Sequence, residues 1–463
     1  MTRTSLIPTD RSVRIIDATL REGSQTPGGA LSLDQSVHVA QLLRAANVDA
    51  IECGHPLIGP HEEARVRAVV EAAGETPVLS HARMCEDDID AVARTGATWV
   101  GLFLGVNEAS VRHRRTPRDS TYVIERAVKH AVGLGLQVRV TIEDGTRTPS
   151  HLMMSCFESA LIAGASRLCL ADTVGALEPS EVAVRVSAIT SVFSDTPVEA
   201  HLHDDRGLAM ANALAAIDAG ASWVSSSVNG LGERAGITDT AALAVNLHLR
   251  GQRDLPGSGD LQRLSDFVAA YSRSGPDARR PVVGSDVFHH VARLHQLAVE
   301  KEPTTYESID PAALGRTRAL GETRRLPQRQ ADLITKPPVI SATELRHHRH
   351  GPGDRYVLID DRFVSGAAQY CIARRFPEGE HPVVGHVDGH VHRCDSLFVF
   401  LGEADGYEGL DVEVTLGDEV FAVQSPASVF IPAGTYHSYR AVRGAGTYLN
   451  HVLSGSYNDS LLD

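Results

Sequence analysis

The chain has 463 residues, of which 43% are hydrophobic and 22% charged, and it carries a formal net charge of −14. This length predicts two or three globular domains, and the negative charge argues against nucleic acid as a partner. The polar residues 1–12 and the lack of any run of about 18 apolar residues predict neither a signal segment nor a membrane span. Six scattered cysteines without a Cys-x-x-Cys pair favour a cytoplasmic location.

Short apolar runs, each followed by an alanine-rich amphipathic segment, alternate along the first half of the chain. This alternation predicts an α/β fold, a (β/α)8 TIM barrel, over residues 1–258. A doubly wound open sheet is the competing fold, but no Gly-x-Gly-x-x-Gly turn follows the first run. The predicted strands are 13–16, 49–52, 77–80, 99–104, 137–142, 167–170, 198–201 and 223–227.

Polar side chains gather just after these predicted strands. In a TIM barrel such positions lie together at the C-terminal mouth, where the active sites of this fold form. The residues are Arg21, Glu22, His55, His81, Arg83, Asn107, Glu143, Asp172, Thr173, His201, His203, Asn229, Glu233 and Arg234.

The pattern changes after the eighth predicted strand. Residues 259–338 combine helical segments, a histidine-rich stretch and a charged, proline-bearing linker, so we predict a helical lid subdomain there. From residue 339 to 463 the sequence alternates apolar residues between glycine turns, which predicts a small all-β barrel as a C-terminal domain.

A histidine pair supplies the best functional clue. His201 and His203 stand two residues apart on a strand, so both project to the same side. Glu22, at the mouth of another strand, completes an N,N,O set for a divalent metal with positions left open for substrate. Arg21 beside it either polarises a carbonyl or serves only as an ion-pair partner. A structural role is the alternative for each histidine.

Two longer motifs make the interpretation specific. The segment 17–28 reads DATLREGSQTPG, and the segments 201–209 and 229–238 read HLHDDRGLA and NGLGERAGIT. They resemble the signatures of the DRE-TIM metallolyase family, whose members include homocitrate synthase, 2-isopropylmalate synthase, citramalate synthase and hydroxymethylglutaryl-CoA lyase. The resemblance covers roughly residues 13–315.

The resemblance implies a role for each motif residue. Glu22, His201 and His203 would bind a divalent metal (Mg, Mn, Zn or Co), and a 2-oxo acid would chelate it. Arg21 would bind the ketone oxygen as it becomes an alkoxide, and Thr173 would hold the carboxylate of the 2-oxo acid. Some family members carry Asn where Ile237 stands, whereas homocitrate synthases often have the Gly-Ile-Thr form found here. Gln25 and Thr141 would contact substrate, and Glu143 would join the catalytic groups.

The same resemblance addresses the choice of 2-oxo acid. Arg139 aligns with the arginine that grips the distal carboxylate in homocitrate-type enzymes, and His55 adds a polar contact. His81 and Arg83 resemble the family's pair on the third strand. An anionic substrate is therefore favoured: 2-oxoglutarate, oxaloacetate or phosphonopyruvate. The alternative for Arg139 is an internal salt bridge to the neighbouring carboxylates at 143 and 144.

The histidine-rich stretch resembles the accessory lid of the family. There a His and a Tyr, usually delivered from the neighbouring subunit, assist enolisation of the acyl-CoA methyl group. We assign these roles to His295 and Tyr306, which implies a homodimer whose lid residues act in trans. Histidines that only pack in a helical hairpin are the alternative.

The C-terminal domain resembles a cupin in two segments. GHVHRCDS at 389–396 and PAGTYH at 432–437 match the two cupin motifs, which would place His390, His392 and His437 on a second metal. Ser396 stands where the first motif supplies Glu. A metal-free domain that dimerises or binds an effector is the alternative.

These observations predict a metal-dependent, Claisen-type acyltransferase. It would condense an acyl-CoA, most simply acetyl-CoA, with an anionic 2-oxo acid, in the manner of homocitrate synthase. One alternative is a metal-dependent C–C lyase or aldolase on the same barrel. The other is an isomerase or oxygenase in which the cupin performs the reaction and the barrel is catalytically inactive.

Overall fold

The computed structural model separates into two compact units, which we describe one at a time. The first comprises residues 1–290 and 297–319, and the second comprises 291–296 and 320–463. The predicted lid, residues 259–338, is divided between them, so its role as a subdomain stays a prediction. The structure describes residues 12–113, 119–272, 277–321, 334, 336–364, 367–382 and 387–462.

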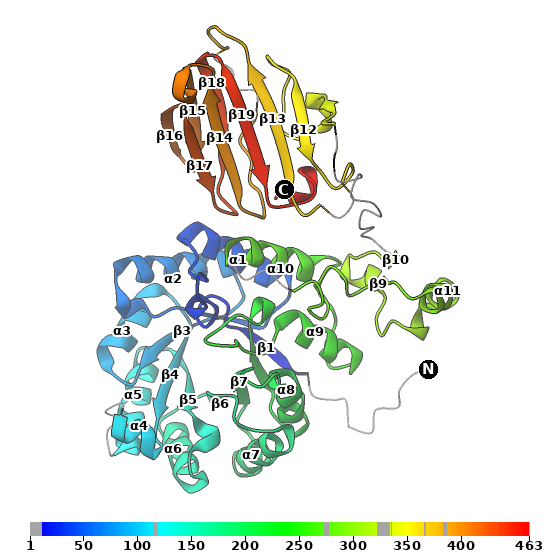
Figure 1. Cartoon of the computed structure of the whole chain (residues 1–463). Coiled ribbons are helices and arrows are strands. Elements are labelled where there is room, and N and C mark those ends of the chain that lie inside the picture. Colours follow the sequence, from blue (N-terminus) through cyan, green and yellow to red (C-terminus); the bar gives the residue numbers. More distant parts are fainter. Residues whose placement is uncertain are drawn as a thin grey trace. The chain divides into compact units, whose positions relative to one another are not determined.

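Eight parallel strands form a closed barrel in the first unit, in sequential order, with β1 pairing to β8 (Figure 1). The predicted TIM barrel is confirmed, and each predicted strand overlaps an observed one. The strands are β1 (Arg14–Asp17), β2 (Ala50–Cys53), β3 (Val78–Arg83), β4 (Trp99–Gly105), β5 (Gln137–Glu143), β6 (Arg167–Asp172), β7 (Val198–Leu202) and β8 (Trp223–Ser226).

Helices follow the strands and cover the outside of the barrel. The first begins at a capping box, in which Ser32 and Gln35 each bond the other's backbone N–H. Apolar side chains from helices and strands form one core between the two layers. The helices are α1 (Leu33–Ala45), α2 (Pro60–Ala73), α3 (Glu86–Thr95), α4 (Glu108–His113), α5 (Ser120–Gly133), α6 (Ser150–Ile162), α7 (Pro179–Val192), α8 (Ala209–Asp218), α9 (Thr240–Leu249) and α10 (Asp260–Tyr271).

The inside of the barrel carries charged side chains. Arg167 lies between two indole rings at the start of β6, with its guanidinium carbon 4.5 Å from the Trp99 ring centre and 3.9 Å from that of Trp223. The electron-rich faces of the two indole rings attract the positive charge of the guanidinium. Buried carboxylates of Glu52 and Glu199 lie further along the interior. The barrel interior beneath the mouth is therefore lined by charged side chains rather than filled by aliphatic ones.

Asp17 at the end of β1 predicts an unusual pH dependence of stability. It is fully buried and accepts hydrogen bonds from the Thr19 backbone N–H at 2.9 Å and the Thr240 hydroxyl at 2.6 Å. Burial outweighs these bonds and raises its pKa from 3.8 to about 6. The folded state thus holds this proton more tightly, so its contribution to stability grows as the pH falls through 6 toward 3.8.

We expect Asp17→Asn to remove this contribution. Between pH 7.5 and 5, the barrel of the wild type should gain about 1 kcal/mol relative to the variant, since each unit of pKa shift corresponds to about 1.4 kcal/mol. Denaturant unfolding at both pH values measures the difference, in which the titration of all other groups cancels. If the free energies of unfolding of the wild type and of Asp17→Asn changed equally with pH, the raised pKa of Asp17 would be contradicted.

The second unit is built from antiparallel strands, as predicted for an all-β domain. One sheet has the order β11-β12-β13-β19-β14-β17 and the other β16-β15-β18. Aromatic side chains such as Phe398 and Tyr448 pack between them. The strands are β11 (Val339–Ile340), β12 (Arg355–Ile359), β13 (Tyr370–Phe376), β14 (Ser396–Gly402), β15 (Leu410–Leu416), β16 (Glu419–Gln424), β17 (Ala427–Ile431), β18 (His437–Gly444) and β19 (Gly446–Val452).

Between these parts the chain forms the short strands β9 (His289–His290) and β10 (Ala319–Leu320), which pair with each other, and helix α11 (Arg293–Lys301). Part of the predicted linker, including residues 322–333, lies outside the described residues. Of the helices that the structure describes, not one has the length and apolar character needed to cross a membrane.

Candidate active site at the barrel mouth

A cavity of about 350 Å³ opens at the C-terminal ends of the barrel strands. It collects most of the residues predicted for the barrel site. Glu233 and Arg234, which the sequence placed at the mouth without a stated role, also line it, and Phe103, Cys169 and Ala171, which the sequence did not indicate, complete its wall. The predicted residues that line it are Arg21, Glu22, Gln25, His55, His81, Arg139, Thr141, Glu143, Thr173, His201 and His203.

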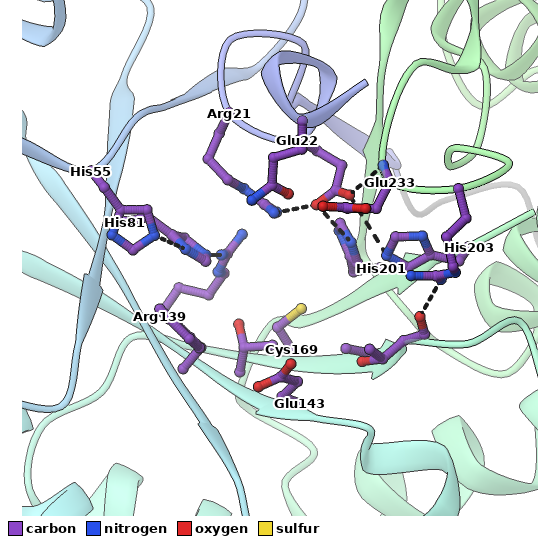
Figure 2. Close-up of a pocket in the computed structure, with 16 residues that line it drawn as sticks. Arg21, Glu22, His55, His81, Arg139, Glu143, Cys169, His201, His203 and Glu233 are labelled. Carbon is purple, nitrogen blue, oxygen red and sulfur yellow. Dashed lines mark hydrogen bonds and ion pairs between the residues drawn. The ribbon is translucent and has the colours of Figure 1, made fainter. Parts of the chain in front are cut away.

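The predicted metal ligands converge on one point of this cavity (Figure 2). The Nε2 atoms of His201 and His203 lie 3.9 and 3.8 Å from the two carboxylate oxygens of Glu22. These distances are too long for hydrogen bonds. They leave room for an ion that each group would approach to about 2.0–2.2 Å. The three side chains therefore fit a divalent metal.

The protonation states also suit a metal. Burial opposes ionisation of Glu22, but Arg21 and the two histidines together lower its pKa to about 2. Burial lowers the pKa of His201 to about 3, and it lowers that of His203 as well. The site thus presents one carboxylate and two neutral imidazoles, the forms in which these side chains bind metals.

Arg21 is held at the cavity by two carboxylates. Its Nε donates to Glu52 at 2.7 Å, and its Nη1 forms an ion pair with Glu22. Glu22 in turn accepts the backbone N–H of Glu233 at 3.1 Å. The guanidinium is therefore fixed in orientation beside the candidate metal, where it can donate to an oxygen that gains negative charge.

Arg139, which the resemblance aligns with the arginine that grips the distal carboxylate, is paired inside the barrel. It is buried, and its Nη1 donates to Glu52 and to Glu199, each at 2.8 Å. Its carboxylate partners come from β2 and β7 rather than from residues 143 and 144. The side chain still borders the cavity, so it can contribute positive charge there. Its contact with substrate stays a prediction.

Glu52 and Glu199 were not assigned to the site from the sequence. Each stands inside an apolar strand, and each is fully buried. Because a buried charge needs a partner, a lone glutamate within an apolar strand of a barrel was a usable signal. The signal indicates an interior ion pair, however, without naming the arginine.

A histidine pair extends from this network along the cavity wall. His81 Nε2 lies 3.1 Å from Arg139 Nη2, and its Nδ1 lies 3.2 Å from His55 Nε2. The same Nε2 lies 3.2 Å from a carboxylate oxygen of Glu52, so His81 joins the guanidinium and the carboxylate in one polar network. Burial keeps the pKa of both imidazoles below the ordinary value. The face of His81 stacks on Phe103 at 4.8 Å, which fixes the ring.

Comparison with known protein families assigns the chain to one of them. A family model described as HMGL-like matches residues 12–269, more than half of the chain. The chain belongs to the HMGL-like family. The predicted DRE-TIM resemblance is thereby confirmed. A second model, described as homocitrate synthase post-HMGL domain-like, matches residues 282–331 of this family member.

Among proteins of known activity, homocitrate synthases are similar in sequence to this chain. The homocitrate synthase of Saccharolobus islandicus is 35% identical over 312 residues, which cover 66% of this chain and 68% of that protein. The homocitrate synthase of Pyrococcus abyssi is 37% identical over 308 residues, covering 66% of this chain and 85% of that protein.

Solved structures agree on the fold. The hydroxymethylglutaryl-CoA lyase of Pseudomonas aeruginosa superposes with a TM-score of 0.52 at 19% identity, covering 58% of this chain and 95% of that one. The corresponding lyase of Brucella melitensis gives 0.51 at 21% identity, covering 57% of this chain and 100% of that one. At these identities the comparison supports the barrel and not the reaction.

Three residues to which the sequence assigned a role in the barrel reaction do not line the cavity in the described part of the chain, and neither do Asn107, Asp172 and Asn229, which were expected at the mouth. Arg83 has a side chain that is 64% exposed and pairs with Asp88. A contact of Arg83 with substrate stays a prediction. Tyr306 follows a short turn in the first unit and is half-exposed, and His295 lies on α11, in the part of that helix assigned to the second unit. A role for these two in the reaction stays a prediction.

The three histidines predicted for a second metal lie together in the C-terminal unit. His390, His392 and His437 are buried, and their candidate ligand nitrogens lie within 4.8 Å of one another. A second metal on these three side chains stays a prediction.

Proposed function

We propose that the chain is an acyltransferase that condenses acetyl-CoA with an anionic 2-oxo acid, releasing CoA and a 2-hydroxy acid with an added carboxylate. The main support for this proposal is that Glu22, His201 and His203 lie together in one cavity, beside Arg21. Homocitrate synthases with 35–37% identity support the reaction class. The candidate acids are 2-oxoglutarate, oxaloacetate and phosphonopyruvate, and we expect the reaction to occur in the cytoplasm.

The side chains of the cavity have separate tasks in this proposal. Glu22, His201 and His203 would hold a divalent metal (Mg, Mn, Zn or Co), which when bound would act as a Lewis acid on the 2-oxo acid. Arg21 would donate to the ketone oxygen as that oxygen gains negative charge. Its ion pairs with two carboxylates restrict its movement, so little reorganisation is needed when the charge develops.

The distal anionic group of the substrate would meet the other side of the cavity. His55 and Arg139 border the cavity there, and His81 connects them. Thr141 and Thr173 lie on the neighbouring strand ends and would bond substrate oxygens. Because Arg139 already contacts two carboxylates, its field at the cavity is partly neutralised. We therefore expect His55 to take a larger share of the distal contact than the sequence suggested.

Formation of the nucleophile needs a group that removes a proton from the acetyl methyl. In our proposal His295 and Tyr306 serve this step in trans within a homodimer, and Glu143 assists from the cavity wall. Gln25 would contact the acyl-CoA side of the substrates from the loop after β1. Water would then hydrolyse the thioester, which draws the reaction toward product.

A thiol-release assay tests the proposal. The full-length protein is incubated with acetyl-CoA, a divalent metal and each of four acids: 2-oxoglutarate, oxaloacetate, phosphonopyruvate and 2-oxoisovalerate. We expect free CoA only when one anionic acid is present. Release with 2-oxoisovalerate alone would overturn the specificity, and silence across the panel would favour the lyase alternative, which a search for cleavage of a 3-hydroxyacyl-CoA would check.

A further inference from the structure

Two arginines lie directly opposite each other inside the C-terminal unit. Arg355 on β12 and Arg374 on β13 are paired in register across neighbouring antiparallel strands (Figure 1). Both side chains lie on the buried face of their strands, with 5% and 1% of their surface exposed. Like charges that face each other across a sheet repel, and burial removes the water that would screen them. The pair is therefore costly for the folded domain.

The charge of this pair is not balanced by a carboxylate among the described residues. Asp360 is the one buried carboxylate in the described part of the C-terminal unit, and it is held by Arg362 at 2.8 Å. Neither Arg355 nor Arg374 forms an ion pair with any carboxylate that the structure describes. Since a buried charge needs a partner of opposite sign, the pair calls for a negative group from outside the chain.

The guanidinium nitrogens lead to the same requirement. Arg374 Nε donates to the carbonyl of Pro352 at 2.8 Å, and Arg355 Nη2 donates to that of Arg349 at 2.7 Å. Both Nη atoms of Arg374 are buried and have no hydrogen-bond partner among the described residues. Buried polar atoms are almost always hydrogen-bonded, so this orphaned fork indicates a ligand that accepts from it. Carboxylates and phosphates accept from both arms of such a fork at once.

A hydroxyl from the facing sheet lies beside the two arginines. Tyr439 on β18 is 3% exposed, and burial raises its pKa, while the charges of Arg374 and Arg355 oppose this rise. Its ring centre lies 4.0 Å from that of Tyr448, the residue that pairs with Arg374 on β19. The neutral phenol can donate its hydrogen to an anion held by the arginines.

We infer that Arg355, Arg374 and Tyr439 bind a small dianion inside the C-terminal unit. The ligand carries its charge on oxygen atoms, as dicarboxylates, phosphonates and phosphates do, because the guanidinium fork matches these groups. Two negative charges balance the two arginines, so the bound ligand turns a repelling pair into a neutral, hydrogen-bonded cluster. The three side chains take no part in the proposed condensation, and the inference does not rest on it.

Equilibrium dialysis of the full-length, chelator-treated protein against labelled phosphate and against labelled malonate tests the inference. We expect Arg355→Met and Arg374→Met each to weaken binding of the preferred dianion by at least about tenfold, as the loss of a hydrogen bond to a charged group does. Anion bound at the barrel mouth is common to all these proteins and cancels in the comparison.

The matched control is Arg375→Met. Arg375 is the next residue on β13, but its side chain lies on the opposite face, is 70% exposed and pairs with Glu403 at 2.7 Å. This variant should bind the dianion as the wild type does. If Arg374 and Arg355 serve only to hold the turn at 349–352, all four proteins will bind phosphate and malonate equally, and that result would overturn the site.

The choice of probe identifies the kind of ligand. Tighter binding of phosphate than of malonate would support a phosphate or phosphonate, and the reverse would support a dicarboxylate. Unlabelled acetate should compete only at concentrations about tenfold higher, because a monoanion satisfies one guanidinium fork rather than two. Competition by acetate at the same concentration as the dianion would overturn the requirement for two charges.

A measurement on the wild type keeps the inference refutable if the arginine variants fail to fold. Crystals of the full-length protein soaked in selenate, a dianion with an anomalous signal, should show a selenium peak within hydrogen-bond reach of the Arg374 guanidinium. Peaks at other places only, or no peak at all, would overturn the site.

Discussion

Replacing Glu22 by Gln should lower the rate of CoA release by more than a hundredfold and remove one bound divalent ion. The change keeps the volume of the side chain but removes the carboxylate that faces His201 and His203 at 3.8–3.9 Å. It also releases Arg21 from one of its two ion pairs. Loss of a mere second-sphere partner costs about 10–100-fold in metal affinity or activity, so loss of a direct ligand should cost more.

The matched control is Glu63→Gln. Glu63 lies on α2 outside the cavity and pairs with Arg67 at 2.9 Å and Arg94 at 3.1 Å, two arginines whose side chains are about half-exposed. It should keep wild-type turnover and metal content, because exposed ion pairs contribute little. Steady-state kinetics with saturating metal and metal analysis of the purified variants measure both effects. Full activity of Glu22→Gln would remove Glu22 from the metal site.

The barrel and its candidate metal ligands were accessible from the sequence because their signals are local. Alternating apolar runs and helical segments predict the eight strands, and the spacing of His201 and His203 places both side chains on one face. Glu22 needed a second inference, that strand ends meet at one mouth. The structure brings these three residues together in the predicted cavity.

The buried ion pairs beneath the cavity could not be predicted from local sequence patterns. Arg139 contacts Glu52 and Glu199, which lie 87 and 60 residues away along the chain. A local pattern shows that each charge is unusual but does not choose among partners on seven other strands. Similarly, Tyr457 and Ser460 belong to a turn after the last strand, and the sequence gives no sign that they contact the C-terminal histidines.

Replacing Arg139 by Met should destabilise the barrel in the absence of any substrate. Arg139, Glu52 and Glu199 are each at most 1% exposed, and Arg139 bridges the two carboxylates. Breaking a buried ion pair by removing one partner costs about 3–5 kcal/mol, since the remaining charge stays in a poorly solvating interior. Each glutamate keeps further partners: Glu52 retains Arg21, and Glu199 retains Arg167 at 3.3 Å and the Ser225 hydroxyl. We therefore expect the lower part of this range.

Arg112→Met provides the control, since it removes an arginine of α4 whose side chain is 65% exposed and whose partner, Glu108, is 82% exposed. This ion pair is of the surface kind on both sides, and the cost should stay near 1 kcal/mol or less. Denaturant unfolding of both variants without substrate separates two roles for Arg139. If Arg139 only gripped the distal carboxylate, its loss would raise KM for the 2-oxo acid and leave the free energy of unfolding unchanged. A loss of several kcal/mol would instead make the ionic network the frame on which the cavity is built, with His55 as the more direct contact for substrate.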